Sequence, residues 1–340
     1  MMLIGNHSWI FQHQPVIVST GVVGGPFEGR GKMSAYFDKI HDDIWLDENS
    51  FEKAQQILFE EACHITLNKH GIKAEEVNFF LGGDLINQIT PSTFTAKSLD
   101  IPYFGLFSAC ATSMEGLALA AFLINNNGAN YVLTGTASHN AATERQFRYP
   151  TEYGGQKPPT SQWTVTGAAC ALVTKTGNGP VITKATIGKV VDMGLNDPFN
   201  MGGAMAPAAV DTIIAHLNDF QLPIDHYDLI LTGDLGDIGL AASYDLLQKK
   251  GFDIAADTIV DCGLSIYADD EKSIHAGASG TASSAVATYG YFLEELKKGK
   301  YNRILVVATG ALHSPLTVQQ KQSIPCIAHA VAIERSEFIT

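Results

Sequence analysis

The fold is decided at residues 107–117, Phe-Ser-Ala-Cys-Ala-Thr-Ser-Met-Glu-Gly-Leu, where small residues surround Cys110 and lead into the apolar segment 117–124. This order predicts a strand-to-helix turn with the cysteine at the N-terminus of the helix. Unpaired N–H groups and the helix dipole at such a point favour a thiolate or a bound anion. An intracellular cysteine is more often a packed structural residue, so both interpretations are open at this stage.

The chain on either side of this turn repeats itself. Three segments have echoes in the same order: 78–85 in 227–235, 109–114 in 278–283, and 129–135 in 304–310. The shared order predicts an internal duplication. Residues 1–175 and 176–340 then form two α/β halves related by a pseudo-twofold axis. Strands that end in glycine and point at one seam predict a pocket where the halves meet.

Hydrophobic patterning places the elements around this seam. Strands are expected at 15–18, 77–81, 131–134 and 167–174, helices at 50–70 and 91–98, a glycine-rich loop at 21–32, and a polar binding loop or lid at 140–162. The glycine-rich loop lacks the strand-turn-helix fingerprint of a nucleotide site.

Composition excludes several classes of function. A net charge of −13 argues against binding to nucleic acid or to an anionic membrane surface. The 5 cysteines are scattered, without a Cys-x-x-Cys pair, which fits a reducing compartment and predicts no zinc site. The N-terminus lacks the layout of a signal peptide, and no apolar run has the length of a transmembrane helix. Any membrane association is therefore expected to be peripheral or through a partner.

Residues 108–113, Ser-Ala-Cys-Ala-Thr-Ser, resemble the nucleophile turn of β-ketoacyl synthases, members of the thiolase superfamily. The resemblance implies a thiolase-like α/β fold with five layers, αβαβα, and a homodimer formed through the strand at 131–134. It also implies two partners for the cysteine: a His after the first long strand of the second half, and a His or Asn on the turn that mirrors the cysteine.

The sequence departs from that pattern around the nucleophile. At the first position, residues 232–237 read Thr-Gly-Asp-Leu-Gly-Asp, so Asp234 stands where relatives have a histidine. At the second, residues 272–280 resemble the thiolase turn Gly-His-Pro-Leu-Gly-Ala-Ser-Gly with one residue fewer, and His275 is expected to keep the role. Residues 326–330 read Cys-Ile-Ala-His-Ala where thiolases have Cys-Ile-Gly-Gly-Gly. Cys326 is therefore either a vestige of the second thiolase cysteine or, as we expect, a packed core residue.

The whole chain, including Asn-Asp-Pro-Phe-Asn-Met-Gly-Gly-Ala-Met-Ala-Pro-Ala at 196–208, resembles the stage V sporulation protein AD family of spore-forming Gram-positive bacteria. The resemblance implies a non-catalytic subunit that binds dipicolinic acid (pyridine-2,6-dicarboxylate) or its calcium chelate. It implies a forespore or spore location, peripheral on the inner membrane. Its partners there are the other subunits of the complex that moves dipicolinate during sporulation and germination. The rival interpretation is an acyl-transferring or condensing enzyme of the thiolase or β-ketoacyl synthase type that uses Cys110.

The missing histidine favours binding, so no catalytic residue, metal site or cofactor is expected. Dipicolinate is a flat dianion that needs donors at both ends. The candidate ligand-binding residues are Cys110, Ala111, His139, Arg145, His275, Asp84 and Asp234.

Four of these candidates, His139, Arg145, Asp84 and Asp234, have a structural alternative. Arg145 and its neighbour Arg148 equally suit a solvated loop face, and His139, like His313, suits a structural role. Asp84 and Asp234 either cap adjoining turns or face the pocket. There a carboxylate repels a dianion unless it is protonated or bridged by a cation such as calcium. No Asp-x-Asp loop supports a dedicated calcium site.

Overall fold

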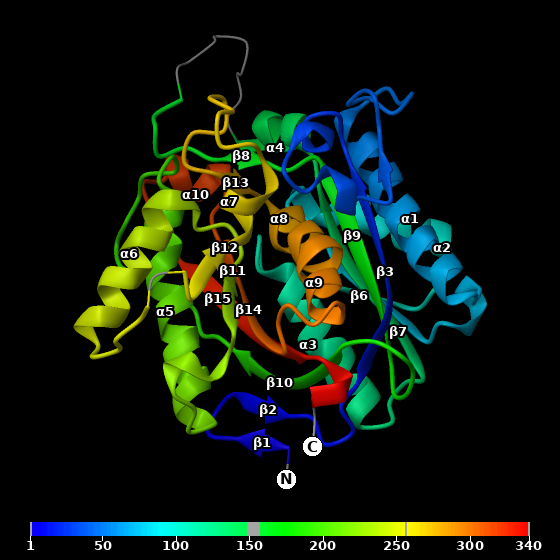
Figure 1. Cartoon of the computed structure of the whole chain (residues 1–340). Coiled ribbons are helices and arrows are strands. Elements are labelled where there is room, and N and C mark those ends of the chain that lie inside the picture. Colours follow the sequence, from blue (N-terminus) through cyan, green and yellow to red (C-terminus); the bar gives the residue numbers. More distant parts are fainter. Residues whose placement is uncertain (1, 148–156, 256, 339–340) are drawn as a thin grey trace.

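The computed structural model of the chain describes residues 2–147, 157–255 and 257–338 (Figure 1). Arg148, half of the expected arginine pair, lies outside these residues. The strands are β1 (Leu3–Ile4), β2 (Ser8–Ile10), β3 (Val16–Gly24), β4 (Lys39–Ile40), β5 (Phe79–Gly83), β6 (Tyr103–Gly105), β7 (Tyr131–Ser138), β8 (Trp163–Thr164), β9 (Gly167–Thr174), β10 (Val181–Ile187), β11 (Leu229–Thr232), β12 (Ile259–Asp261), β13 (Ala278–Ser279), β14 (Arg303–Ala311) and β15 (Cys326–Glu334).

The helices alternate with these strands. They are α1 (Phe51–His70), α2 (Thr90–Leu99), α3 (Thr112–Asn125), α4 (Asn140–Phe147), α5 (Met201–Asp219), α6 (Gly236–Lys249), α7 (Cys262–Ile266), α8 (Thr281–Val286), α9 (Leu293–Lys297) and α10 (Pro315–Gln319). A π-helical segment, Ala287–Phe292, joins α8 to α9. Local sequence signals set the bounds of α1, because Ser50 caps its first turn by accepting from the Lys53 N–H, and Gly71 ends it in the left-handed conformation.

The main sheet has a palindromic strand order. It runs β12-β11-β14-β15-β10 and then β3-β9-β7-β5-β6. In the first half β5 pairs in parallel with β6 and β7, and β7 and β3 flank β9 in antiparallel fashion. In the second half β11, β12, β14, β15 and β10 repeat these pairings. β5 and β11, the strands that precede Asp84 and Asp234, therefore occupy equivalent positions in the two halves. The chain passes between the halves after Thr174 and before Val181, and the boundary at residue 175 stays a prediction.

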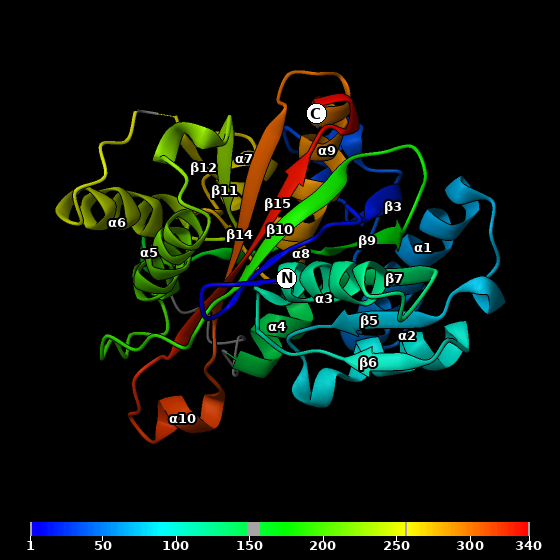
Figure 2. The ribbon, with the colours of Figure 1, turned by 90° about the horizontal axis from the view of Figure 1, so that it is seen from below.

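Three hydrophobic cores separate five layers of structure. One core lies between α1, α2 and the first half of the sheet, and another lies between α5 and the second half. The largest core surrounds α3 and α8, which lie between the two halves (Figures 1 and 2). This gives the expected αβαβα order and buries the helix that follows Cys110 at the centre of the molecule.

The structure corrects two sequence-based assignments in the loops. The expected glycine-rich loop at 21–32 begins inside β3, which continues to Gly24. Gly21 is needed there because a Cβ atom would lie 2.4 Å from the Ala62 carbonyl oxygen of α1. The expected polar loop at 140–162 begins with α4. Its residues, including alanine, glutamate, arginine and glutamine, are good helix formers, although the segment has no long apolar stripe.

The structure also contradicts the expectation that two copies of the chain pair through the strand at residues 131–134. β7, which contains residues 131–134, has β5 on one side and β9 on the other, so its backbone groups have no free edge. The outer strand of the first half is β6, which pairs with β5 alone within the described chain. An intermolecular strand pairing at this half therefore requires β6.

Candidate functional site

The turn that carries Cys110 is held by its own hydrogen bonds. The Ala111 N–H donates to the Ser108 carbonyl oxygen at 3.0 Å. The Thr112 hydroxyl donates to the Ala109 carbonyl oxygen at 2.7 Å and accepts from the Ser108 N–H at 3.1 Å. Ala109 has a φ of 48°, in the left-handed region that non-glycine residues rarely adopt. The turn is therefore constrained on both sides of the cysteine.

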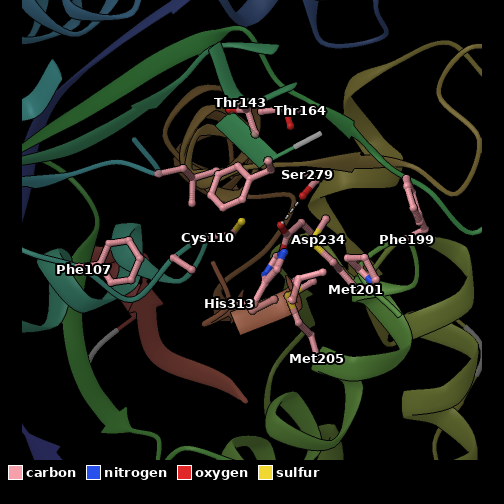
Figure 3. Close-up of a pocket in the computed structure, with 16 residues that line it drawn as sticks. Phe107, Cys110, Thr143, Thr164, Phe199, Met201, Met205, Asp234, Ser279 and His313 are labelled. Atoms are coloured by element: carbon pink, nitrogen blue, oxygen red, sulfur yellow. Dashed lines mark hydrogen bonds between the residues drawn. The ribbon is translucent and has the colours of Figure 1, made fainter. Parts of the chain in front are cut away.

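The cysteine opens onto a pocket at the seam of the two halves. Its volume is about 350 Å³, at the lower end of the range for small-molecule sites. It is lined by Leu85, Phe107, Ala109, Cys110, Thr143, Phe147 and Thr164 of the first half, and by Pro198, Phe199, Met201, Met205, Asp234, Ser279, Ala311, His313 and Val318 of the second. Figure 3 shows Phe107 on one flank, Phe199 and Met201 on the other, and Cys110 and Asp234 between them.

Asp234 lies at the centre of the polar part of this pocket, two residues after the end of β11. One carboxylate oxygen accepts from the Thr309 hydroxyl at 2.8 Å. The other accepts from the Ser279 hydroxyl at 3.1 Å and from the Gly280 N–H at 3.3 Å. The Cys110 thiol lines the same part of the pocket, and the Asp234 charge raises the pKa of that thiol. Segments from both halves of the chain thus converge on a single acidic side chain.

Burial controls the protonation of this pair. Asp234 is 1% exposed, and burial raises its pKa to about 7; its hydrogen bonds oppose the shift, while the charge of nearby Asp261 adds to it. Burial also raises the pKa of the Cys110 thiol well above its ordinary value, and the Asp234 charge raises it further. Of the two possibilities at the helix start, a thiolate or a bound anion, burial and the neighbouring carboxylate oppose the thiolate and favour a neutral Cys110 thiol.

The remaining predicted site residues lie outside the pocket lining. Ala111 is fully buried, and its N–H is engaged within the turn. His139 is buried below α1, where its Nε2 atom contacts the Ile44 carbonyl oxygen at 2.8 Å. Arg145 lies on α4 and forms an ion pair with Glu52 of α1. Their positions therefore fit a structural role for His139 and a surface ion pair for Arg145 better than contact with a ligand in the pocket.

Asp84 and His275 are also outside the lining, for different reasons. Asp84 is buried, and its carboxylate accepts from the Ile86 N–H at 2.7 Å, from the Ser92 N–H at 2.9 Å and from the Ser92 hydroxyl. It therefore caps the start of α2. His275 is exposed, with a φ of 55°, because the shortened turn projects it into solvent. Of the seven candidates, Cys110 and Asp234 are the pair that the structure brings together in the pocket.

Sequence reasoning missed much of the wall formed by α4, α5 and α10. Residues 196–208 form a distinctive segment in the sequence, but nothing in their pattern indicates that Phe199, Met201 and Met205 line a pocket with Cys110. His313 was noted only as the counterpart of His139. In the structure His313 lines the pocket and packs against the Phe147 ring, with 5.6 Å between ring centroids. The duplicated histidines therefore have different environments.

The described residues include no group of three or more His, Cys, Asp and Glu side chains arranged to hold a metal ion. Cys326 is fully buried in β15, as expected for a core residue. None of the helices in the described ranges is both long and apolar enough to cross a membrane.

Comparison with solved structures shows the fold. 3-Oxoacyl-[acyl-carrier-protein] synthase III from Aquifex aeolicus VF5 matches 94% of this chain and 99% of its own, with a TM-score of 0.59 and 13% identity. An OleA variant from Xanthomonas campestris matches 95% of this chain and 99% of its own, with a TM-score of 0.60 and 14% identity. Another OleA structure, with bound lauric acid and lauroyl-CoA, gives a TM-score of 0.59 at 14% identity and covers 95% of this chain and 100% of that one. The chain has the thiolase-like fold of these proteins.

Comparison of sequences identifies the family. The family described as stage V sporulation protein AD matches residues 5–334. Stage V sporulation protein AD of Bacillus subtilis (strain 168) is 46% identical over 336 residues, which cover 99% of each chain. These matches confirm the resemblance seen in the sequence, and the chain belongs to the stage V sporulation protein AD family.

Proposed function

We propose that this sporulation protein binds dipicolinic acid, free or as its calcium chelate, in the Cys110 pocket and without covalent chemistry. It does so as a peripheral subunit of the inner spore membrane complex that moves dipicolinate during sporulation and germination. The role in sporulation follows from the family. The observation that carries the binding function is that Cys110 and Asp234 line one pocket, with an acidic side chain where the resemblance implies a histidine partner for the cysteine.

The same pairing argues against acyl transfer. A cysteine nucleophile reacts as the thiolate, and both burial and the Asp234 charge raise the pKa of Cys110. The pKa of Asp234 is about 7, so the proton stays on sulfur. His275, which resemblance assigns to the second catalytic position, is exposed and outside the pocket lining. Of the two positions that the resemblance assigns to catalytic histidines, one holds Asp234 and the other, His275, lies outside the described lining; the histidine that does line the pocket, His313, follows β14.

The pocket suits a small flat acid. Its phenylalanine and methionine walls can cover an aromatic ring, while Cys110, Thr143, Thr164 and Ser279 supply polar contacts. α3 begins two residues after Cys110, and α5 begins at Met201 in the opposite wall. The positive ends of the two helix dipoles thus favour a negatively charged ligand. This potential compensates for the lack of lysine and arginine in the described lining.

We also propose that a second copy of the chain pairs along β6. Phe104 on this edge strand is 47% exposed, and Phe94 of α2 and Phe107 beside the pocket are 47% and 54% exposed. An exposed strand edge flanked by large apolar side chains is unstable in isolation and tends to pair with another strand. A twofold contact at β6 would cover the edge in both copies.

Calorimetric titration with dipicolinate, with and without Ca²⁺, tests the binding function. Cys110→Trp fills the pocket and should abolish binding while the circular dichroism spectrum stays unchanged. Arg145→Ala serves as the matched control: because Arg145 pairs with Glu52, its loss should leave the affinity unchanged. Unaltered binding by Cys110→Trp would show that the ligand lies elsewhere. Turnover of acyl-coenzyme A at enzymatic rates, lost in Cys110→Ala, would instead establish the rival acyl-transfer function.

A further inference from the structure

We propose that Asp234 makes the pocket a proton-coupled site, in which a carboxylate ligand binds together with one proton that Asp234 takes up. This inference rests on the proposed function and names the ionic form in which the acid is recognised. Asp234 thereby determines specificity, because its protonated carboxyl group favours ligands that can accept a hydrogen bond from it.

The geometry creates the need for a proton. Asp234 lines the pocket beside Cys110 and Ser279, so a ligand that contacts the cysteine also approaches the Asp234 carboxyl group (Figure 3). Lysine and arginine are absent from the described part of the lining. A carboxylate that enters therefore meets another carboxylate, and no cationic side chain among the described lining residues bridges the two. Two like charges at contact distance are strongly unfavourable in a buried site.

A proton removes this conflict and adds a favourable contact. Neutral Asp234 no longer repels the ligand, and its O–H group can donate to a ligand carboxylate. Such charge-assisted O–H···O⁻ hydrogen bonds are short and strong. The carboxyl can accept this proton near neutrality because burial raises its pKa to about 7 in the empty pocket. A bound anion shifts that pKa further upward, so proton uptake accompanies binding.

The other ionisable groups around Asp234 are three buried thiols and the buried carboxyl group of Asp261. Cys110, Cys262 and Cys326 are buried thiols with raised pKa values, so they remain neutral in this pH range. Asp261 is buried behind Asp234 and outside the lining. Its carboxylate accepts from the Thr232 hydroxyl at 2.7 Å and from the N–H groups of Leu235 and Gly236 at 2.8 and 3.2 Å.

His313 is a further titratable side chain in the described pocket wall, besides Asp234 and the Cys110 thiol. Protonation of His313 would also favour an anion, so the test must separate the two side chains. Substitution of Asp234 does this, because it removes the carboxyl group and retains the imidazole.

The internal duplication provides a matched control. Asp84 follows β5 as Asp234 follows β11, and burial raises its pKa to about 6. Its oxygens accept from the Ile86 and Ser92 N–H groups and from the Ser92 hydroxyl, and it does not line the pocket. Asp84→Asn therefore removes an equally buried carboxyl group without changing the ligand's surroundings.

The test is calorimetric titration of the full chain with dipicolinate between about pH 6 and pH 8.5, in buffers of different ionisation enthalpy. If only the protonated site binds, a pKa of about 7 predicts that affinity falls roughly 30-fold across this range. Close to one proton should be taken up per ligand at the alkaline end. Asp234→Asn should reduce the change to within about twofold, because the site then carries no titrating carboxyl group. Asp84→Asn should keep the full slope.

The outcomes separate this inference from the proposed function. Binding by the unchanged protein with no pH slope, or with the same slope in Asp234→Asn, overturns the inference alone. Binding that requires Ca²⁺ and takes up no proton also overturns it, and shows that the cation neutralises the pair. No binding at any pH, with or without Ca²⁺, overturns the proposed function and this inference together.

Discussion

The Asp234→Asn variant should be more stable than the unchanged protein at alkaline pH and less stable than it at acidic pH. The carboxyl group has a pKa of about 7 when folded and an ordinary value of 3.8. A raised pKa means that the folded state binds the proton more tightly than the unfolded state. The contribution to stability is therefore complete below about pH 4 and is lost as the pH rises through 7.

The size of this stability difference follows from the shift in the pKa of Asp234 on folding. About 3 pKa units correspond to roughly 4 kcal/mol that the unchanged protein loses between pH 4 and pH 8.5 and the variant keeps. Asparagine can still accept from the Thr309 hydroxyl, but its NH₂ group faces the Gly280 N–H, which costs about 1–3 kcal/mol at every pH. The expected net gain at pH 8.5 is therefore about 1–3 kcal/mol, with a net loss at pH 4.

Urea denaturation of both proteins at several pH values measures this difference. Asp84 and Asp261 also have pKa values raised to about 6, so both stability curves should fall with pH, but that fall is common to the two proteins. The diagnostic quantity is the gap between the curves, which should change sign across the range. Parallel curves would refute the reasoning, because they would mean that Asp234 titrates alike in the folded and unfolded states.

Two further substitutions test the turn and the edge strand. Gly310→Ala places a Cβ atom 2.3 Å from the Ser108 carbonyl oxygen and should displace the Cys110 turn; we expect a lower thermal midpoint and weaker dipicolinate binding, and unchanged values for both would contradict the proposed packing. Phe104→Asp should convert a dimer to a monomer in light scattering after size-exclusion chromatography, whereas Val190→Asp, an equally exposed apolar site away from β6, should not. Equal masses for both variants would exclude pairing at β6.

The sequence predicted the features that depend on local signals and on the order of segments. The Ser50 cap and Gly71 define α1 because helix ends use local chemistry. The ordered echoes predicted two equivalent halves and a pocket where they meet, since equivalent segments of a duplicated unit occupy equivalent positions. The palindromic strand order itself was not predicted. The nucleophile turn was recognised because its small residues are contiguous.

Features that depend on distant contacts could not be predicted. Asp84 and Asp234 occupy the same local pattern, a buried strand followed by Gly-Asp. What distinguishes them is that Asp84 meets Ser92, eight residues away, whereas Asp234 meets Ser279 and Thr309, which are brought to it only by the fold. Whether a strand lies at the edge or inside the sheet also depends on distant contacts. β7 is an inner strand because β5 and β9, which come from separate parts of the chain, pair with it.

The same proton should govern both the stability and the ligand binding of this protein. A charged Asp234 is unfavourable in two ways. In the empty pocket it is buried without a lysine or arginine in the described lining, and during binding it repels an acidic ligand. A histidine at this position would act as a base toward the thiol, whereas an aspartate keeps the thiol protonated and responds to the charge of the ligand. If the chain binds dipicolinate as proposed, an aspartate in place of a histidine after β11 changes what the pocket recognises and leaves the nucleophile turn in place. On that proposal, this one replacement makes a pocket of the thiolase-like fold select an acid instead of forming a thioester.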